Sequence, residues 1–396
     1  MPQALVLLFA AACGLSVANV YYAQPLLDAL ARDFGFSDAA VGIVITATQL
    51  GCALALLFVV PLGDLLDRRR LTLAQLLLLC AALLAVGVAG SPALLLAGML
   101  AVGLLGTAMT QGLIAYAASA AAPAERGRVV GAAQGGVVIG LLLARTLAGL
   151  VADMSGWRAV YFASAGLALA MLAILWRMLP PQTPPALRLS YLQLLGSMFH
   201  LLARERVLQL RGVIAMLMFA AFSIFWSALA LPLSAPPYSL SHTAIGAFGL
   251  VGVAGALGAA RAGRLADRGL GQWTTGTALA LLVLCWLPIA LMPYSLWALA
   301  IGILLLDLAG QAIHVTNQSM IFSAQTEAHS RLVGCYMLFY AAGSGAGAIA
   351  STSIYAAFGW AGVCLLGAGV SLAALVFWWV SLRWMPSFLR PFGAIR

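Results

Sequence analysis

The 396-residue sequence contains no lysine, and charged residues of all kinds make up only 8% of it, whereas a typical soluble domain carries about 25%. Without lysine the chain cannot hold a phosphate-binding loop of the G-x4-G-K-S/T type, which argues against direct use of ATP. Neither the four histidines nor the six cysteines show the spacing of metal ligands. We therefore expect a protein without enzymatic activity, metal or cofactor.

The chain is instead rich in long hydrophobic stretches. Apolar residues make up 64% of it and the mean hydropathy is +1.05. Twelve apolar stretches, each near the roughly 20 residues that cross a bilayer as a helix, cover residues 4–30, 39–62, 72–90, 92–119, 129–152, 158–180, 209–234, 243–262, 273–293, 295–319, 330–357 and 360–384. The pattern predicts an all-α integral membrane protein in contact with lipid. It excludes a soluble Rossmann domain, a nucleic-acid binder and a secreted disulfide protein.

Arginine is distributed unevenly between the loops on alternate sides of the membrane. If the N-terminus is cytoplasmic, seventeen of the twenty arginines, Arg211 among them, lie in cytoplasmic loops or in the C-terminal tail. Arg32 and Arg158 lie on the opposite side, and Arg145 lies inside a span. By the positive-inside rule we expect both termini in the cytoplasm. The net charge of +9 is then a signal of topology.

The two halves of the sequence repeat one another. The loops after the second and eighth spans share glycine, aspartate and arginine at equal spacing, namely Gly63, Asp67 and Arg68 in the first and Gly263, Asp267 and Arg268 in the second. The pair Gly156-Trp157 before the sixth span returns 203 residues later as Gly359-Trp360 before the twelfth. We therefore predict an N-terminal six-helix bundle (1–180), a cytoplasmic linker (181–208) and a C-terminal six-helix bundle (209–396).

Two parallel six-helix halves are typical of one class of secondary transporters, and here the sequence resembles the major facilitator superfamily. The segment from Gly63 to Arg70 is similar to that family's loop signature, G-x-L-x-D-R-x-x-R. The resemblance implies a substrate cavity between two pseudo-symmetric bundles. It also implies a gating role for this loop and its copy, in which Asp67 and Arg68 pair with each other and with helix ends. The alternative is a basic turn that only fixes topology.

The fifth span resembles the G-x8-G-x3-G-P-x2-G-G pattern of proton antiporters in this superfamily. Gly131, Gly140 and Gly149 occupy glycine positions, two further glycines are replaced by alanine, and Arg145 stands where the family has proline. Small residues at this spacing are expected to pack the fifth helix tightly against the other half. A buried arginine needs an acid or water, so we expect Arg145 to contact Asp28, either directly or through a bridging water. The alternative is that it snorkels to the membrane surface.

Acidic groups inside spans are candidates for proton coupling. A charge there is energetically costly, so such residues are rare unless they have a function. Asp307 lies near the middle of the tenth span, with Gln311 at i+4 and His314 at i+7 on the same helix face. Asp28 lies near the outer end of the first span. We expect Asp307, His314 and Asp28 to be the proton-coupling candidates. The alternative is a polar stripe that only hydrates a cavity.

Other polar and aromatic side chains inside spans are candidates for the substrate cavity. They are Asn19, Tyr22, Gln24, Gln49, Gln111, Phe222, Trp226, Gln311, Tyr336 and Tyr340. Hydroxyl and amide groups can hydrogen-bond a substrate, and rings can stack on one. The alternative for each is packing between helices.

These observations predict a secondary active transporter of the bacterial inner membrane, most simply a proton-coupled exporter of a small organic compound that works as a monomer. A proton-coupled uptake symporter for a sugar or nucleoside-like metabolite is the first alternative. A membrane sensor with a transporter-like body is the second, although the sequence has no soluble signalling domain.

Overall fold

The computed structural model describes residues 1–122, 125–179, 190–324 and 329–383, with the side chains of 253–264, 266–267, 322–324 and 329–330 left aside. The described residues form helices joined by short loops and contain no strand. The helices are α1 (Gln3–Tyr21), α2 (Leu27–Phe34), α3 (Ile43–Leu54), α4 (Arg68–Gly87), α5 (Pro92–Ala120), α6 (Arg126–Ser155), α7 (Trp157–Met178), α8 (Tyr191–Arg204), α9 (Arg206–Ala228), α10 (Ala230–Ser234), α11 (His242–Leu265), α12 (Gly271–Leu284), α13 (Trp286–Ala290), α14 (Leu296–Ala324) and α15 (His329–Ser381).

The predicted number of spans is confirmed. Ten helical segments in the described part of the chain are long and apolar enough to cross a membrane, and the last of them, Arg331–Ser381, is broken at Gly359. Gly359 has a φ of 62°, which glycine adopts without strain, so α15 supplies two spans. The first turns of α11 form a shorter apolar helix, His242–Gly252. Nine single spans, the two in α15 and α11 make twelve.

The chain forms two compact units. Unit 1 contains Met1–Ser37, Ile43–Leu195 and Leu233–Gly249, and unit 2 contains Asp38–Gly42, Gly196–Pro232 and Leu250–Arg396. Each unit therefore includes a short segment from the other half of the sequence. The first turns of α11 belong to unit 1, and the rest of that helix belongs to unit 2.

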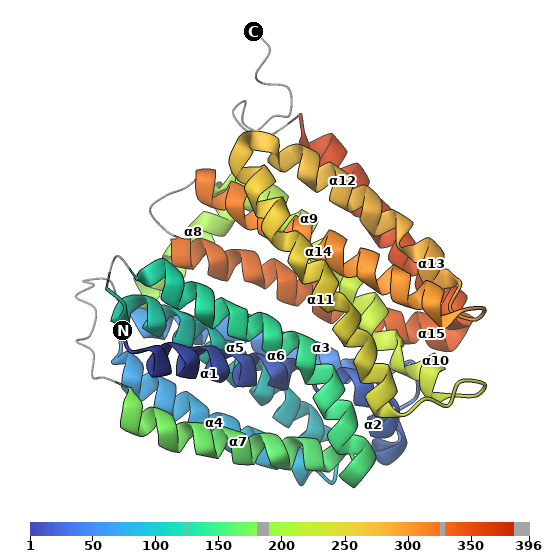
Figure 1. Cartoon of the computed structure of the whole chain (residues 1–396), viewed down its shortest axis with the longest axis horizontal. Coiled ribbons are helices and arrows are strands. Elements are labelled where there is room, and N and C mark those ends of the chain that lie inside the picture. Colours follow the sequence, from blue (N-terminus) through green and yellow to red (C-terminus); the bar gives the residue numbers. More distant parts are fainter. Residues whose placement is uncertain (123–124, 180–189, 325–328, 384–396) are drawn as a thin grey trace. The chain divides into compact units, whose positions relative to one another are not determined.

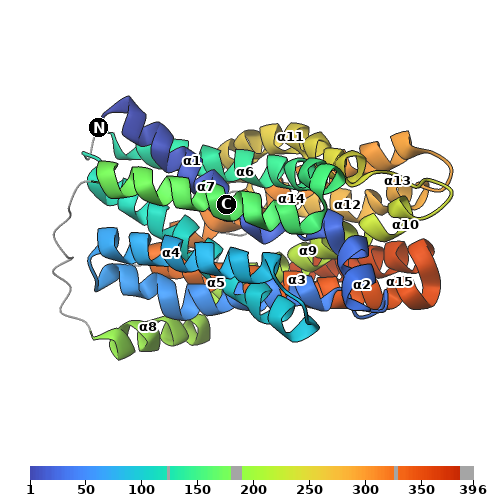
Figure 2. The ribbon, with the colours of Figure 1, turned by 90° about the horizontal axis from the view of Figure 1, so that it is seen from below.

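Unit 1 is held together by close helix packing around α1 and α6, which lie side by side (Figure 1 and Figure 2). A Cβ added to Gly140 of α6 would collide with the backbone of Gly14 of α1, and Gly136 faces Ala10 in the same way. Glycine at these positions lets the two backbones touch, as is common between helices in lipid. Gly140 therefore packs α6 against α1 of its own half, and the expected contact with the other half is not made there.

Unit 2 is built around the contact between α9 and α15. Ser223 of α9 donates to the Ser344 carbonyl of α15 at 2.7 Å, and Ser351 of α15 donates to the Ile224 carbonyl at 2.6 Å. Trp286 of α13 adds a bond from its ring nitrogen to Ser371 Oγ at 3.0 Å. Hydroxyls that bond to a neighbouring helix are satisfied without water, which suits helices surrounded by lipid.

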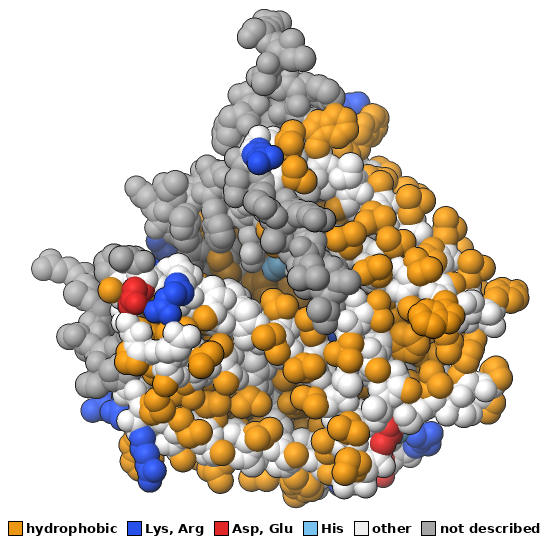
Figure 3. All heavy atoms as spheres, viewed as in Figure 1, with side chains coloured by type: hydrophobic (Ala, Val, Ile, Leu, Met, Phe, Trp, Pro, Cys, Tyr) orange, Lys and Arg blue, Asp and Glu red, His pale blue; other side chains and the backbone are white. Residues whose placement is uncertain are grey.

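The outer faces of the helices are apolar. Large hydrophobic side chains are exposed on both units, among them Trp176 in unit 1 and Trp297 and Leu365 in unit 2. On the face drawn in Figure 3, hydrophobic side chains cover much of the surface of each unit, and the described charged side chains lie in a few small groups. A soluble protein rarely leaves so much contiguous apolar surface in water. The surface therefore fits a lipid-embedded protein.

Candidate functional site

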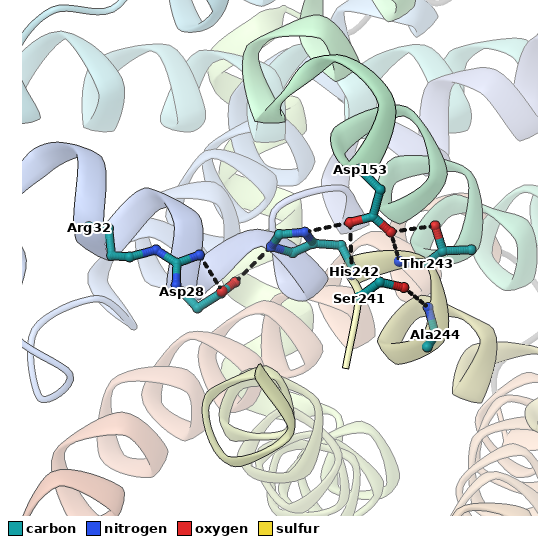
Figure 4. A network of polar contacts seen from close by, with 7 residues as sticks. All are labelled: Asp28, Arg32, Asp153, Ser241, His242, Thr243 and Ala244. Carbon is teal, nitrogen blue, oxygen red and sulfur yellow. Dashed lines mark hydrogen bonds and ion pairs between the residues drawn. The ribbon is translucent and has the colours of Figure 1, made fainter. Parts of the chain in front are cut away.

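A network of acidic and basic side chains in unit 1 joins three helices (Figure 4). We call it the α11 network and define it as Asp28 of α2, Asp153 of α6 and His242, the first residue of α11. The His242 ring lies between the two carboxyl groups, with Nδ1 2.8 Å from Asp153 Oδ1 and Nε2 3.2 Å from Asp28 Oδ1. Both distances are in the range of hydrogen bonds. One imidazole thus bridges two acids from different helices.

Asp153 accepts further hydrogen bonds besides its contact with the His242 ring. Its Oδ1 also accepts the backbone N–H of His242 at 3.0 Å, and its Oδ2 accepts the Thr243 backbone N–H at 2.8 Å and the Thr243 hydroxyl at 2.6 Å. The first N–H groups of a helix have no partner within the helix. A carboxylate from another helix therefore caps α11, and its negative charge faces the positive end of the helix dipole.

Asp28 is buried, with 8% of its surface exposed. Its Oδ2 accepts a 2.8 Å ion pair from Arg32, one turn later on α2, whose side chain is 69% exposed. The other oxygen of Asp28 faces His242. Asp28 thus contacts His242 of the α11 network with one oxygen and the exposed guanidinium of Arg32 with the other.

Arg145 is not bonded directly to Asp28, the partner that we expected from the sequence. It is 2% exposed, and its Nε donates to Gln24 Oε1 at 2.6 Å, while its guanidinium lies over the Tyr21 ring at 5.2 Å. Asp28 pairs with Arg32 and His242 instead. An amide and an aromatic face near the end of α1 therefore hold this charge, which also shows that Arg145 does not snorkel outward.

Gly149, one turn beyond Arg145 on α6, makes the contact between sequence halves that we expected of the fifth span. A Cβ at Gly149 would collide with the His242 carbonyl and the Thr243 nitrogen, and one at Gly246 would collide with the Arg145 carbonyl. Thr146 Oγ1 also donates to the Gly246 carbonyl at 3.0 Å. The small residues of α6 therefore seat the first turns of α11 close enough for Asp153 to reach them.

The polar residues at the end of the first span are packed against α7. Asn19 Oδ1 accepts the Ser164 hydroxyl at 2.7 Å, and Asn19 Nδ2 donates to the Leu15 carbonyl of its own helix at 2.7 Å. Tyr22 is buried beside the same serine. These contacts are those of a helix–helix joint.

Asp307 lies in the middle of α14 and is 7% exposed. It packs in unit 2 against Gly252 of α11, where a Cβ would collide with the carboxyl group. The glycine leaves room for an acid between two helices. Asp307 is therefore a buried carboxyl on a membrane span, as we expected from the sequence.

Unit 2 also buries a cation that the sequence analysis had assigned to a cytoplasmic loop. Arg211, in the second turn of α9, is 0% exposed. Its Nη1 donates to Thr275 Oγ1 of α12 at 2.9 Å and to Asn317 Oδ1 of α14 at 3.3 Å. Among the residues that the structure describes, its Nε and Nη2 have no hydrogen-bond partner. The loop assignment was therefore wrong, because Arg211 lies on the buried face of α9, within the apolar stretch 209–234 itself.

Tyr336 lies near this cation and is the first of several aromatic side chains that contact one another. His314 Nδ1 lies 3.0 Å from the Tyr336 hydroxyl, and the Phe219 ring packs edge-on against both His314 (5.4 Å) and Tyr340 (4.5 Å). We call Arg211, Thr275, Asn317, His314 and Tyr336 the Arg211 cluster. It brings together two residues that the sequence had assigned to different roles, His314 as a proton carrier and Tyr336 as a cavity residue.

The remaining candidates are dispersed. Phe222 and Trp226 lie one turn apart on α9, with ring centres 6.3 Å apart. Gln49 is buried, whereas Gln111 and Gln311 are half-buried. Arg268 is exposed, and Gly263 and Asp267 fall in the stretch whose side chains are outside the described ones.

The loop signature is arranged differently from the expected Asp67–Arg68 pair. Asp67 Oδ1 accepts the Arg70 backbone N–H at 3.0 Å and so caps α4. Arg68 pairs with Asp64 at 3.1 Å and donates to the carbonyls of Gly63 (2.8 Å) and, on α5, Ala115 (3.2 Å). Contacts with helix ends are therefore present, as expected.

A second group of charges lies just before α6. Glu125 accepts the Met1 ammonium at 2.5 Å and Arg128 at 3.0 Å. The ammonium, which has the larger effect, and then Arg128 lower the pKa of Glu125. This contact ties the N-terminus to the start of α6.

Comparison with known proteins identifies the chain's relatives. The model of the Major Facilitator Superfamily matches residues 6–323. The sequence is 45% identical to the uncharacterized transporter YgaY of Escherichia coli O157:H7 over 379 residues, which is 96% of each chain. It is 31% identical to the purine ribonucleoside efflux pump NepI of Salmonella paratyphi B over 215 residues, which is 53% of this chain and 51% of that one.

The fold is also shared with solved structures. A bacterial homologue of the human lysosomal transporter Spinster superposes with a TM-score of 0.76 at 13% sequence identity, covering 96% of this chain and 97% of that one. At this identity the likeness establishes the fold, and the twelve-span architecture is confirmed by it.

Proposed function

Because the chain belongs to the Major Facilitator Superfamily of membrane transporters, we propose that it exchanges protons for a small organic compound that leaves the cell. The family establishes that the protein is a transporter that works in a lipid bilayer on small molecules. The proposal adds that protons drive the transport and that the compound moves outward. It also adds that the protein is a monomer in the inner membrane with both termini in the cytoplasm.

Buried Asp307 is the observation that carries proton coupling. A carboxylate at the centre of a membrane helix is costly when charged, and Asp307 is almost fully buried between α14 and Gly252 of α11. Binding a proton removes that cost, whereas losing one favours a hydrated or substrate-bound arrangement. An acid whose burial depends on its proton is a device for coupling proton movement to a change in helix packing.

The direction and substrate class are supported by a relative. NepI is a purine ribonucleoside efflux pump, so an outward-directed exchanger for a nucleoside-like compound is the simplest starting point. The aromatic rings near the Arg211 cluster, including Phe219 and Tyr340, could stack on a base. Uptake by symport remains the competing function, and the sign of the pH gradient that drives accumulation separates the two.

The test uses purified full-length protein in liposomes with an imposed pH gradient. Inosine is the first probe, and a ligand-stabilisation screen selects another compound if inosine does not raise the melting temperature. In the Asp307→Asn variant the side chain mimics the protonated acid permanently. We expect exchange of labelled for unlabelled probe to continue and accumulation driven by the pH gradient to disappear.

Asp38→Asn is the matched control, because it makes the same chemical change at an exposed aspartate and should leave accumulation unchanged. If the Asp307→Asn protein still concentrates the probe in response to the gradient, Asp307 is not the proton carrier. If wild-type protein accumulates the probe only when the gradient has the sign required for symport, the outward direction is wrong.

A further inference from the structure

The contacts of the α11 network require one proton more than its side chains carry when His242 is neutral and both aspartates are charged. Both ring nitrogens of His242 face carboxylate oxygens, at 2.8 Å and 3.2 Å. A carboxylate oxygen is an acceptor only, so each of these contacts needs a hydrogen between the two atoms. Neutral imidazole carries one N–H and can therefore satisfy one contact. Two contacts require one proton more.

The surroundings of Asp153 restrict where the extra proton can reside. Asp153 accepts two backbone N–H groups, the Thr243 hydroxyl and the His242 ring, and it faces the positive end of α11. Four donors and the helix dipole favour its charged form. The extra proton therefore lies between His242 Nε2 and Asp28 Oδ1, the one contact that is left without a hydrogen.

The other charges near the network do not replace this proton. On α2, Arg32 is bonded to the far oxygen of Asp28, and Asp33 is paired with Arg158 of α7. On α6, Arg145 is bonded to Gln24. None of these three contacts places a hydrogen between His242 Nε2 and Asp28 Oδ1. Loss of the shared proton would leave a ring lone pair facing a charged oxygen.

We propose that Asp28 and His242 form a proton-binding site that holds the first turn of α11 against α2, separate from Asp307. When the site is protonated, a charge-assisted hydrogen bond joins α2 to α11. When it is deprotonated, the two facing acceptors repel and α11 remains attached to unit 1 through Asp153 and the glycine contacts. The inference is independent of the transport proposal, because a uniporter with these residues would bind the same proton.

Hydrogen exchange at the start of α11 tests this site without any substrate. The backbone N–H groups of His242 and Thr243 are bonded to Asp153, so they report how firmly the first turn is held. In full-length protein in lipid nanodiscs, after correction for intrinsic rates, we expect their protection to fall about tenfold between pH 6 and pH 9, as for loss of one hydrogen bond to a charged group.

Two substitutions of Asp28 give opposite and specific outcomes. In Asp28→Asn the amide can donate to the neutral ring, so protection should stay high at both pH values. In Asp28→Ala no partner remains for Nε2, so protection should be low at both. His200→Gln, at an exposed histidine of α8, is the control for His242→Gln and should keep the wild-type pH dependence, whereas His242→Gln should lose it.

The proposal is overturned if wild-type protection is the same at pH 6 and pH 9, or if Asp28→Asn keeps the wild-type drop. Nitrogen NMR of the four histidine rings provides a measurement that needs no folded variant at Asp28. We expect both His242 nitrogens to be engaged in hydrogen bonds at pH 7, with the signals assigned by their loss in His242→Gln. A single N–H and a free Nε2 would also overturn it.

Discussion

The α11 network of unit 1 and the Arg211 cluster of unit 2 each contain a buried charged side chain, Asp28 and Arg211, but they balance its charge differently. In the network, each acid faces a basic group, and Asp28 also pairs with the solvent-exposed Arg32. In the cluster, the Arg211 guanidinium is bonded only to neutral oxygens of Thr275 and Asn317 among the described residues. Opposite charges hold the α11 network together, whereas the Arg211 cluster surrounds its charge with neutral hydrogen-bonding groups.

The difference has a consequence for what mutations should do. Removing one partner from a charged pair leaves the other uncompensated, and the loss of stability is large where the remaining group is buried, as Asp28 is. Removing a buried cation whose bonds in the described part of the chain go to neutral groups leaves no opposite charge behind there. The two regions should therefore respond oppositely to loss of their charged members, and the variants below are chosen to test that contrast in order of decreasing effect.

Asp153→Ala should have the largest effect on stability. The substitution removes the acceptor of four hydrogen bonds and leaves the first N–H groups of α11 without their cap. Loss of a cap and of a charged hydrogen bond together should lower the free energy of unfolding by about 2–3 kcal/mol. Thermal melting of the purified protein measures this. Asp153→Asn keeps the acceptor oxygen and should recover part of the loss.

Asn317→Ala should have the next largest effect. Asn317 accepts from Arg211 Nη1 and donates to the Arg211 carbonyl, so its loss should cost about 1–2 kcal/mol in the same melting assay. Arg211→Met, which fills similar volume without charge, should cost less than Asn317→Ala, or should raise the melting temperature. A larger loss for Arg211→Met than for Asp153→Ala would abolish the contrast.

Arg32→Gln should have the smallest effect. Its side chain is 69% exposed, and exposed ion pairs contribute about 0–1 kcal/mol. A loss below about 1 kcal/mol, reduced further at high salt because exposed charges are screened, would place Arg32 at the edge of the α11 network. A loss as large as that of Asp153→Ala would show that Arg32 is essential to it.

The fold was predictable from the sequence because hydrophobic length alone determines where helices cross a membrane. The twelve spans and the break at Gly359 follow from apolar runs separated by short polar loops. Span ends were less predictable. Arg211 was assigned to a loop because a charge at the edge of an apolar run looks like a membrane boundary, although Ile214, Ala215 and Met218 place it on the buried face of α9.

The site was predictable only where its residues stand out locally. Asp307 and Asp28 could be found because acids are rare inside spans. His242 was missed because its acid partners lie 89 and 214 residues away in sequence and no periodic pattern connects them. The partner of Arg145 was missed for a related reason: the sequence offered one nearby acid, whereas the amide of Gln24 provides the bond.

The capping of α11 by Asp153 has a consequence for the order in which the protein is made. Asp153 is synthesised 89 residues before His242, whose backbone N–H it accepts. During translation the end of α6 therefore enters the bilayer with its carboxylate still lacking that partner. Unit 1 can be completed only after the central linker and α9 have left the ribosome and the start of α11 has followed them. A nascent chain that stops before residue 242 should expose Asp153 to water, to lipid headgroups or to the insertion machinery.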